Sequence, residues 1–256
     1  MIEQLKQQKV LIAGAGGLLG VKLVKQALAQ GAEVIAADIN IELMNEKLIK
    51  QDIDLDNCQL TRLHLDVTDE QNVKTFFAEQ AGLTGAVNCT YPRNSTYGAH
   101  FFDVSLGSFN ENLALHLGSA FVFTKQCAAY FKHQQNTFSL VNISSIYGVI
   151  APKFEVYDNT PMTMPVEYAA IKSAILHLNK YVVAYVNDSR FRINSVSPGG
   201  IFDHQPEDFL KAYKKNTHGE GMLNVDEVIG SVLFLLSKQS RFVTGQNIIV
   251  DDGFSL

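Results

Sequence analysis

The sequence has no long apolar run, no cluster of basic residues and only three cysteines. A membrane helix needs about 18 or more apolar residues in succession, and no segment approaches that length. The formal net charge of −5 and the lack of a basic run argue against a general nucleic-acid binder. We therefore expect neither a membrane nor a nucleic acid among the partners.

The three cysteines, Cys58, Cys89 and Cys127, are scattered along the chain. They form no CxxC pair and no cluster with histidine, so the sequence predicts neither a disulfide framework nor a metal site. Free thiols in this pattern are typical of a reducing compartment, and we expect a cytoplasmic location.

One N-terminal feature resembles a secretory signal: Lys6 and Lys9 precede the apolar run Val10–Val21. Four glycines interrupt that run, and strand and helix patterns follow it directly. We therefore interpret it as the first structural unit rather than as a signal peptide.

Strand-like and helix-like segments alternate along the 256 residues, of which 46% are hydrophobic and 18% charged. The expected strands are Lys9–Ala13, Glu33–Asp38, Gln59–Leu65, Ala86–Cys89, Thr137–Ile143, Arg192–Val196 and Asn247–Val250. The expected helices are Leu18–Gln30, Ile41–Gln51, Asp69–Gln80, a long stretch from about Ser105 to His133, Val166–Asn187 and Val225–Ser237. The alternation predicts one α/β domain over residues 1–256: a doubly wound, Rossmann-type, seven-stranded parallel sheet with helices on both faces.

A glycine-rich turn, Ala13 to Gly20, separates the first strand from the first helix. Glycine permits tight turning and close backbone approach, and the start of a helix favours an anionic pyrophosphate. The position of this turn predicts a dinucleotide site. The alternative, a plain strand-to-helix turn, stays open.

Asp38 closes the second strand, 18 residues after Gly20. A carboxylate at this place can accept hydrogen bonds from the adenosine-ribose hydroxyls and would repel a 2′-phosphate. Because no Arg or Lys lies in the glycine turn or next to Asp38 in the sequence, NAD is favoured over NADP. The alternative is an ordinary cap for the helix that follows.

Tyr168 and Lys172 lie four residues apart near the start of a long helix, so they share one face. A tyrosine needs about 4 kcal/mol of differential stabilisation to titrate near neutrality, and a close ammonium could supply much of it. Such a pair can move a proton to or from a carbonyl oxygen during hydride transfer. Two strand ends, Asn142–Gly148 and Asn194–Gly200, should open at the same sheet edge.

With these motifs together, the sequence resembles the short-chain dehydrogenase/reductase family over almost its whole length. The resemblance rests on the glycine turn, Asp38, Asp66-Val67, Asn88, Ser144-Ser145 with Gly148, the YxxxK pair, Pro198-Gly199, and Thr244-Gly245 with Asp252-Gly253. It implies that Ser145 polarises the substrate oxygen, Tyr168 is the acid/base, and Lys172 binds the nicotinamide ribose and lowers the Tyr168 pKa. It also implies a homotetramer or homodimer.

The resemblance further implies two sets of binding residues. The cofactor-binding set is Gly14, Gly17, Leu18, Leu19, Gly20, Asp38, Ile39, Asp66, Val67, Asn88, Cys89, Tyr168, Lys172, Pro198, Gly199 and Ile201. The substrate-binding set is Tyr91, Arg93, Tyr147 and Tyr157.

The chain departs from the family pattern at several of these positions. Leu18 takes the place of the middle glycine of the turn, and Asp203 that of a threonine after Pro198-Gly199. The family's catalytic asparagine falls on His116, five residues before Phe121. We expect His116 to occupy the proton-relay position, with a packed core histidine as the alternative.

The largest departure is length, because 23 residues separate Ser145 from Tyr168, more than in typical members. The extra segment, about Val149–Val166, carries three prolines and several polar groups and predicts a substrate-shaping lid. Members of the broader superfamily that act on sugar nucleotides have a similarly long spacing between this serine and this tyrosine. The stretch before Lys172 is also similar to a bacterial subgroup linked to flagellin modification and nonulosonic-acid sugars.

The sequence thus predicts an NAD(H)-dependent oxidoreductase that interconverts an alcohol and a ketone on a small, polar, sugar-like substrate. Two alternatives stay open. One is a 3-oxoacyl-thioester reductase that uses NADPH, although Asp38 and the acidic balance disfavour it. The other is a dinucleotide-binding scaffold or sensor with impaired turnover, which Leu18 and His116 keep open.

Overall fold

The computed structural model describes residues 3–134 and 136–256. Its strands are β1 (Lys9–Ala13), β2 (Glu33–Asp38), β3 (Leu60–His64), β4 (Gly85–Asn88), β5 (Phe138–Ile143), β6 (Phe191–Pro198) and β7 (Asn247–Val250). They form one seven-stranded sheet in the order β3-β2-β1-β4-β5-β6-β7, and every pairing is parallel. The predicted Rossmann-type fold is confirmed.

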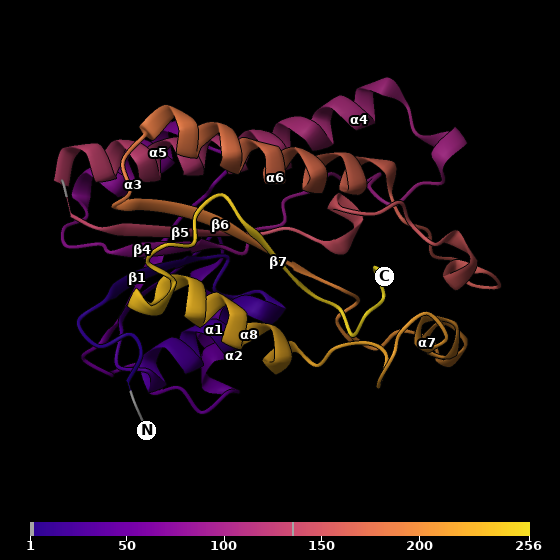
Figure 1. The fold of residues 1–256 in the computed structure, drawn as a ribbon, viewed down its shortest axis with the longest axis horizontal. Coiled ribbons are helices and arrows are strands. Elements are labelled where there is room, and N and C mark those ends of the chain that lie inside the picture. Colours follow the sequence, from indigo (N-terminus) through magenta and orange to yellow (C-terminus); the bar gives the residue numbers. More distant parts are fainter. Residues whose placement is uncertain (1–2, 135) are drawn as a thin grey trace.

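Two layers of helices cover the sheet (Figure 1). One layer holds α1 (Leu18–Ala29), α2 (Ile41–Ile49) and α8 (Val225–Leu236), and the other holds α3 (Glu70–Glu79), α5 (Ser119–Gln134) and α6 (Val166–Val186). The central strands are buried on both faces, which explains their apolar sequences.

The helix starts follow local sequence signals. The Asn40 side chain accepts a hydrogen bond from Leu43 N at the start of α2, and Asp69 caps α3 in the same way. Asn224 and Glu227 form a capping box at the start of α8. These residues therefore fix where the chain enters each helix after a strand.

Two features differ from the expected pattern. The stretch expected as one long helix is α4 (Leu106–Asn112), a π-helical turn Leu113–Gly118 and then α5. Helix α7 (Glu207–Lys214), which no sequence signal had identified, follows β6 beyond the carboxyl edge of the sheet (Figure 1). Short 3₁₀ turns occur at Phe101–Asp103, Ile146–Gly148, Phe154–Tyr157 and Lys238–Ser240.

The register brings the carboxyl ends of the central strands to one edge. Ala13 of β1 pairs with Ala37 of β2 and with Asn88 of β4, and Asn88 pairs in turn with Asn142 of β5. The chain reverses its direction of winding between β1 and β4, where open α/β sheets hold their ligands.

In the described part of the chain, no helix combines the length and the apolar character that a membrane span requires. No group of three or more His, Cys, Asp or Glu side chains among these residues is arranged to hold a metal ion.

Candidate active site

The glycine turn between β1 and α1 is shaped by two close backbone approaches. Gly14 has a φ of +77°, and a Cβ there would lie 3.0 Å from the carbonyl carbon of Cys89. A Cβ on Gly20 would collide with the carbonyl oxygen of Gly14. Helix α1 begins without a side-chain cap, so its first N–H groups face the turn uncapped. This cradle fits an anionic pyrophosphate.

Leu18, which replaces a glycine of the family pattern, does not obstruct this cradle. Its side chain is 49% exposed and lines a hollow on the outer side of the turn. The neighbouring Leu19 is buried and lines the central cavity described below.

A side hollow of about 380 Å³ lies across the ends of β1, β2, β3 and β4. Asp38 lies in it with both carboxylate oxygens held by backbone: Oδ2 accepts from Gly16 N at 2.9 Å, and Oδ1 from Asn40 N at 3.1 Å. Ile39, Asp66 and Val67 also line this hollow. The structure thus gathers, from the ends of β2 and β3, four residues that the sequence assigned to the cofactor-binding set.

Lys47 is a residue of this hollow that the sequence argument missed. Its Nζ donates to the carbonyl oxygen of Gly16 at 2.8 Å. Lys47 lies nine residues after Asp38, but the turn that begins α2 brings it back over the glycine turn. Its spacing of seven from Asn40, two helical turns after the cap, is the signal that could have placed it on this side of α2.

A central cavity of about 390 Å³ adjoins the side hollow, and both are lined by Cys89, Thr90 and Tyr91. Asn88, just before them, orients this segment because its Oδ1 accepts from Thr90 N at 3.1 Å and from Thr90 Oγ1 at 2.7 Å. Burial raises the pKa of the Cys89 thiol to about 12, so Cys89 is a packing residue here rather than a thiolate.

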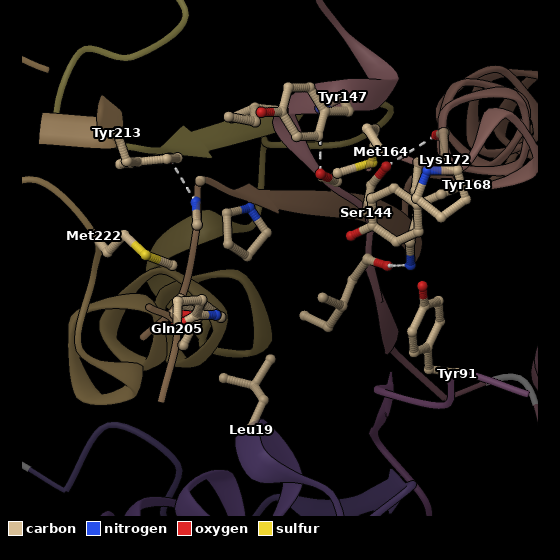
Figure 2. A pocket seen from close by; sticks show the side chains of 18 of the residues that line it. Leu19, Tyr91, Ser144, Tyr147, Met164, Tyr168, Lys172, Gln205, Tyr213 and Met222 are labelled. Carbon is tan, nitrogen blue, oxygen red and sulfur yellow. Dashed lines mark hydrogen bonds between the residues drawn. The ribbon is translucent and has the colours of Figure 1, made fainter. Parts of the chain in front are cut away.

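Ser145, Tyr168 and Lys172 meet in the wall of the central cavity. Ser145 follows β5, and its Oγ accepts from Tyr147 N at 3.2 Å. Tyr168 and Lys172 project from the first turns of α6, where Figure 2 shows them side by side. Burial raises the pKa of Tyr168, while a hydrogen bond with Ser145 opposes that shift.

Lys172 is buried and held in place by two contacts. Its Nζ donates to the carbonyl oxygen of Ile143 at 2.9 Å and lies 3.4 Å from Nε2 of His116. Burial lowers the pKa of Lys172 to about 7. The sequence led us to expect that a charged Lys172 lowers the pKa of Tyr168. In the structure burial is the largest influence on both pKa values, so the pKa of Tyr168 is raised instead.

His116 lies in the π-helical turn and points at Lys172. It is 3% exposed, and burial lowers its pKa to about 2, so the imidazole is neutral at physiological pH. Its Nδ1 is buried and has no hydrogen-bond partner among the described residues. The structure therefore brings His116 next to Lys172, close to the proposed proton relay of Tyr168 and Lys172.

Tyr91 packs over Tyr168 and His116 from the loop after β4. Its ring contacts Tyr168 edge-on, with centroids 5.6 Å apart, and His116 at 5.1 Å. Its hydroxyl is hydrogen-bonded to the hydroxyl of Tyr97. Arg93 stacks over the outer side of the Tyr91 ring at 4.9 Å and is exposed, and it lines neither the cavity nor the hollow.

A buried polar cluster fixes this loop. Asn112 accepts from Asn94 N at 3.0 Å and donates to the Asn94 side chain at 3.1 Å. It also lies 3.4 Å from Oε1 of Glu167, a fully buried carboxyl group beside Tyr168. The loop that carries Tyr91 is thus joined to α4 and to the start of α6.

The long segment after Ser145 forms one wall of the cavity, as expected of a lid. Tyr157 donates to the Tyr147 hydroxyl at 3.4 Å, and Met162, Met164 and Pro165 complete this wall. Another part of the wall comes from the segment after β6, where Figure 2 shows Gln205, Tyr213 and Met222. These residues were missed because α7 has no sequence motif of the family, although its charge-flanked apolar face was a usable signal.

Pro198, Gly199 and Ile201 line the cavity between these walls. Gly200 N donates to the hydroxyl of Tyr213 at 2.6 Å. A Cβ on Gly199 would lie 2.8 Å from that same hydroxyl oxygen, so the loop after β6 packs tightly against α7.

Comparisons with known proteins agree with this arrangement. A family model described as "Enoyl-(Acyl carrier protein) reductase" matches residues 14–255. Post-translational flagellin modification protein A of Campylobacter coli is 34% identical, over 98% of this chain and 100% of that protein. The 7alpha-hydroxysteroid dehydrogenase of Bacteroides fragilis is 24% identical, over 96% and 94%. A crystal structure of a short chain dehydrogenase from Leptospira borgpetersenii with bound NAD+ is 28% identical, with a TM-score of 0.86, covering 99% of this chain and 95% of that one.

Proposed function

The chain belongs to the short-chain dehydrogenase/reductase family and is an NAD(P)-dependent oxidoreductase, and we propose that it interconverts an alcohol and a ketone with NAD(H) on a polar, sugar-like substrate. The observation that carries the proposal is the convergence of Ser145, Tyr168 and Lys172 in one cavity wall beside the glycine turn. We further propose that residues 1–256 act as one nucleotide-binding domain.

The cofactor would lie along the carboxyl edge from the side hollow to the central cavity. Its adenosine ribose would meet Asp38, with Ile39, Asp66 and Val67 around the base. Its pyrophosphate would face the backbone of Gly14, Gly17, Leu18 and Gly20 at the start of α1. Its nicotinamide would lie near Leu19, Cys89 and the Pro198–Ile201 loop, within reach of the Lys172 amine.

The protein's own groups handle the proton while a bound nicotinamide supplies or accepts the hydride. Because burial raises the pKa of Tyr168, its hydroxyl is protonated at neutral pH and is ready to donate to a carbonyl oxygen. Ser145 would hold that oxygen through its hydroxyl. In the direction of alcohol oxidation, the positive charges of Lys172 and of the oxidised nicotinamide would favour the tyrosinate.

The shape of the cavity supports a ring-shaped alcohol as substrate. Tyr147, just before the lid, and Tyr157 within it line the cavity with their rings and hydroxyls, while Met162, Phe209 and Met222 give it apolar surface. Such a lining can hydrogen-bond the hydroxyls of a ring and pack against its C–H faces. One relative is named a 7alpha-hydroxysteroid dehydrogenase, which supports a hydroxyl on a ring as the reacting group, and another is named for flagellin modification. Arg93 would contact only a substrate that extends beyond the cavity.

The decisive experiment is a screen of sugars, keto-sugars, sugar nucleotides and alicyclic alcohols that follows NADH absorbance. A 3-oxoacyl thioester with NADPH is included as the competing substrate. We expect a hydroxylated ring compound to turn over, and Tyr168→Phe to lose about 10³-fold or more in kcat while still binding NADH. The matched control is Tyr185→Phe, an exposed tyrosine on the same helix.

Three results would overturn the proposal. Turnover unchanged in Tyr168→Phe would remove the catalytic assignment. Turnover of the thioester alone, with NADPH, would instead favour the 3-oxoacyl reductase. NADH binding without turnover of any compound would favour the scaffold alternative.

A further inference from the structure

Lys47 lies where a cofactor's adenosine ribose would meet the protein. It is half-buried, and its ammonium is fixed on the carbonyl oxygen of Gly16. It lines both the side hollow and the hollow on the outer side of the glycine turn, which also holds Lys50. Its amine is therefore at the boundary between the two spaces.

Gly16 joins this ammonium to the carboxylate of Asp38. The N–H of Gly16 donates to Asp38 Oδ2, and its carbonyl oxygen accepts from Lys47 Nζ. These two atoms of Gly16 are separated by three covalent bonds, so the opposite charges of Asp38 and Lys47 flank one peptide segment. A Cβ at Gly16 would lie 3.1 Å from Asp38 Oδ2, which shows how tightly the carboxylate is applied to the turn.

The charge of Lys47 is not neutralised by a neighbour. Among the described residues that line the side hollow, Lys47 is the only cation, against the carboxylates of Asp38 and Asp66. Its contact is with a neutral carbonyl, and within residues 3–134 and 136–256 it forms no salt bridge with an acidic side chain. A lysine on a flexible stem can leave such an acceptor for an anion.

We propose that Lys47 determines how the enzyme discriminates between NAD(H) and NADP(H), by supplying the counter-charge for a 2′-phosphate. Asp38 alone would repel that phosphate, and Lys47 offsets the repulsion from the other side of Gly16. The enzyme then prefers NADH but also binds NADPH. This inference rests on the proposed function only in placing the adenosine ribose in the side hollow, and it revises the expectation that no basic residue is near Asp38.

The test measures binding of NADH and of NADPH to the full chain by fluorescence titration, so it needs no substrate. The variants are Lys47→Met, Lys47→Gln, Asp38→Asn and the double variant Asp38→Asn/Lys47→Met. Gln keeps a donor for Gly16 but has no charge. The matched control is Lys25→Met, a half-buried lysine on α1 that, unlike Lys47, lines neither hollow. Thermal melting checks that each variant is folded.

We expect wild-type protein to bind NADPH about tenfold more weakly than NADH. Lys47→Met and Lys47→Gln should each raise the Kd for NADPH by a further factor of about ten. The Kd for NADH should change by less than about threefold. Asp38→Asn should strengthen NADPH binding, and the double variant should lose that gain. The Lys47 effect should shrink at high salt, because screening weakens it.

Several outcomes would overturn the inference. Equal losses for the two cofactors in Lys47→Met would mean that Lys47 only supports the glycine turn. NADPH binding restored in Lys47→Gln would assign the effect to the hydrogen bond rather than to charge. If Asp38→Asn strengthens NADPH binding and the double variant binds NADPH equally well, Lys47 does not reach the phosphate. These results are distinct from failure of the proposed function, in which the cofactors bind as expected but no alcohol is turned over.

Discussion

The side chain of Lys172 is buried, and this burial lowers its pKa from 10.5 to about 7. Between these two values the unfolded chain keeps the proton on this lysine while the folded chain releases it. The free energy of unfolding therefore rises with pH across this window, and below about pH 7 the cost of burying the ammonium is fully present. The burial of Lys172 therefore makes the free energy of unfolding depend on pH.

The substitution Lys172→Met should remove this pH dependence of the free energy of unfolding. Relative to wild type, we expect the variant to be most stabilised near pH 7, and the difference to narrow by ~3 kcal/mol towards pH 10. Urea unfolding at several pH values measures it, and other titrating groups cancel because they are common to both proteins. A difference that is constant with pH would show that Lys172 is protonated in the folded state throughout.

His116 should act on the reaction through Lys172. Its Nε2 can accept from the Lys172 ammonium, and an acceptor favours the charged form of an amine. We expect His116→Ala to lower kcat by about tenfold or more, and to move the pH limb assigned to Lys172 to lower pH. His116→Asn, which restores the residue type of the family, should recover much of the rate.

The pH profile separates this role from simple packing. Because the pKa of His116 is lowered to about 2, its own titration should not be visible between about pH 5 and pH 9. Equal rates and pH profiles for wild type and His116→Ala would return His116 to the status of a packed core residue.

At the scale of elements, the lid is anchored to the C-terminal segment. Lys153 Nζ donates to the carbonyl oxygen of Phe254 at 2.8 Å and lies 4.6 Å from the centre of its ring. Phe254 is fully buried and stacks on Tyr213 of α7, with centroids 4.3 Å apart. The lid and α7, which both line the cavity and touch each other at Tyr157 and Phe209, therefore both pack against Phe254.

We expect Lys153→Met to loosen the lid while leaving the reacting groups in place. KM should rise by about threefold to tenfold with a smaller change in kcat, since one charge-assisted hydrogen bond contributes on the order of 1.5 kcal/mol. Hydrogen exchange followed by mass spectrometry should show faster exchange over 149–165. Lys180→Met, at an exposed position on α6, is the control. An unchanged exchange rate in the lid would show that the anchor is dispensable.

The π-helical turn is the other element that matters for the site. It inserts a wider turn into the long helix at Leu113–Gly118, and His116 projects from it towards Lys172. Single π turns are often found at functional sites. The sequence showed the helix and the position of His116, but the helical periodicity did not show where the wider turn would form, because that depends on packing against α6.

At the scale of the whole molecule, the outer faces of α5 and α6 carry exposed aromatic side chains. Tyr181 and Tyr185 are 62% and 69% exposed and stack on each other, and Phe121 on the neighbouring helix is 48% exposed. Figure 1 shows the two helices lying along one face of the sheet. Exposed apolar surface of this kind is a candidate for self-association.

We expect a homodimer or homotetramer that uses this face. The double variant Tyr181→Glu/Tyr185→Glu should lower the molar mass measured by light scattering, because it places charge in the contact. Phe102→Glu, at a 95% exposed aromatic elsewhere, should not. A wild-type monomer would contradict the expectation of an oligomer, and an unchanged mass in the double variant would move the contact to another surface.

The sequence determined the fold and pointed to the candidate catalytic trio. Buried strands and amphipathic helices alternate too regularly for another fold class, and Ser145, Tyr168 and Lys172 follow family motifs that are local in the chain. The position of Asp38 could be predicted in the same way, because it is the last residue of a strand. Local patterns of this kind survive folding because hydrophobic burial and backbone hydrogen bonding act on neighbours in sequence.

Only the tertiary structure decided the electrostatics and the far wall of the cavity. The pKa values of Tyr168 and Lys172 depend on burial by segments distant in sequence, and this burial reverses the expected shift of Tyr168. Lys47 reaches the glycine turn only because α2 folds back over it, and α7 meets the lid through the Tyr157–Phe209 ring contact and through Phe254. Desolvation and long-range contacts are properties of the packed molecule, so local sequence signals could suggest Lys47 and α7 but could not fix their contacts or the pKa values.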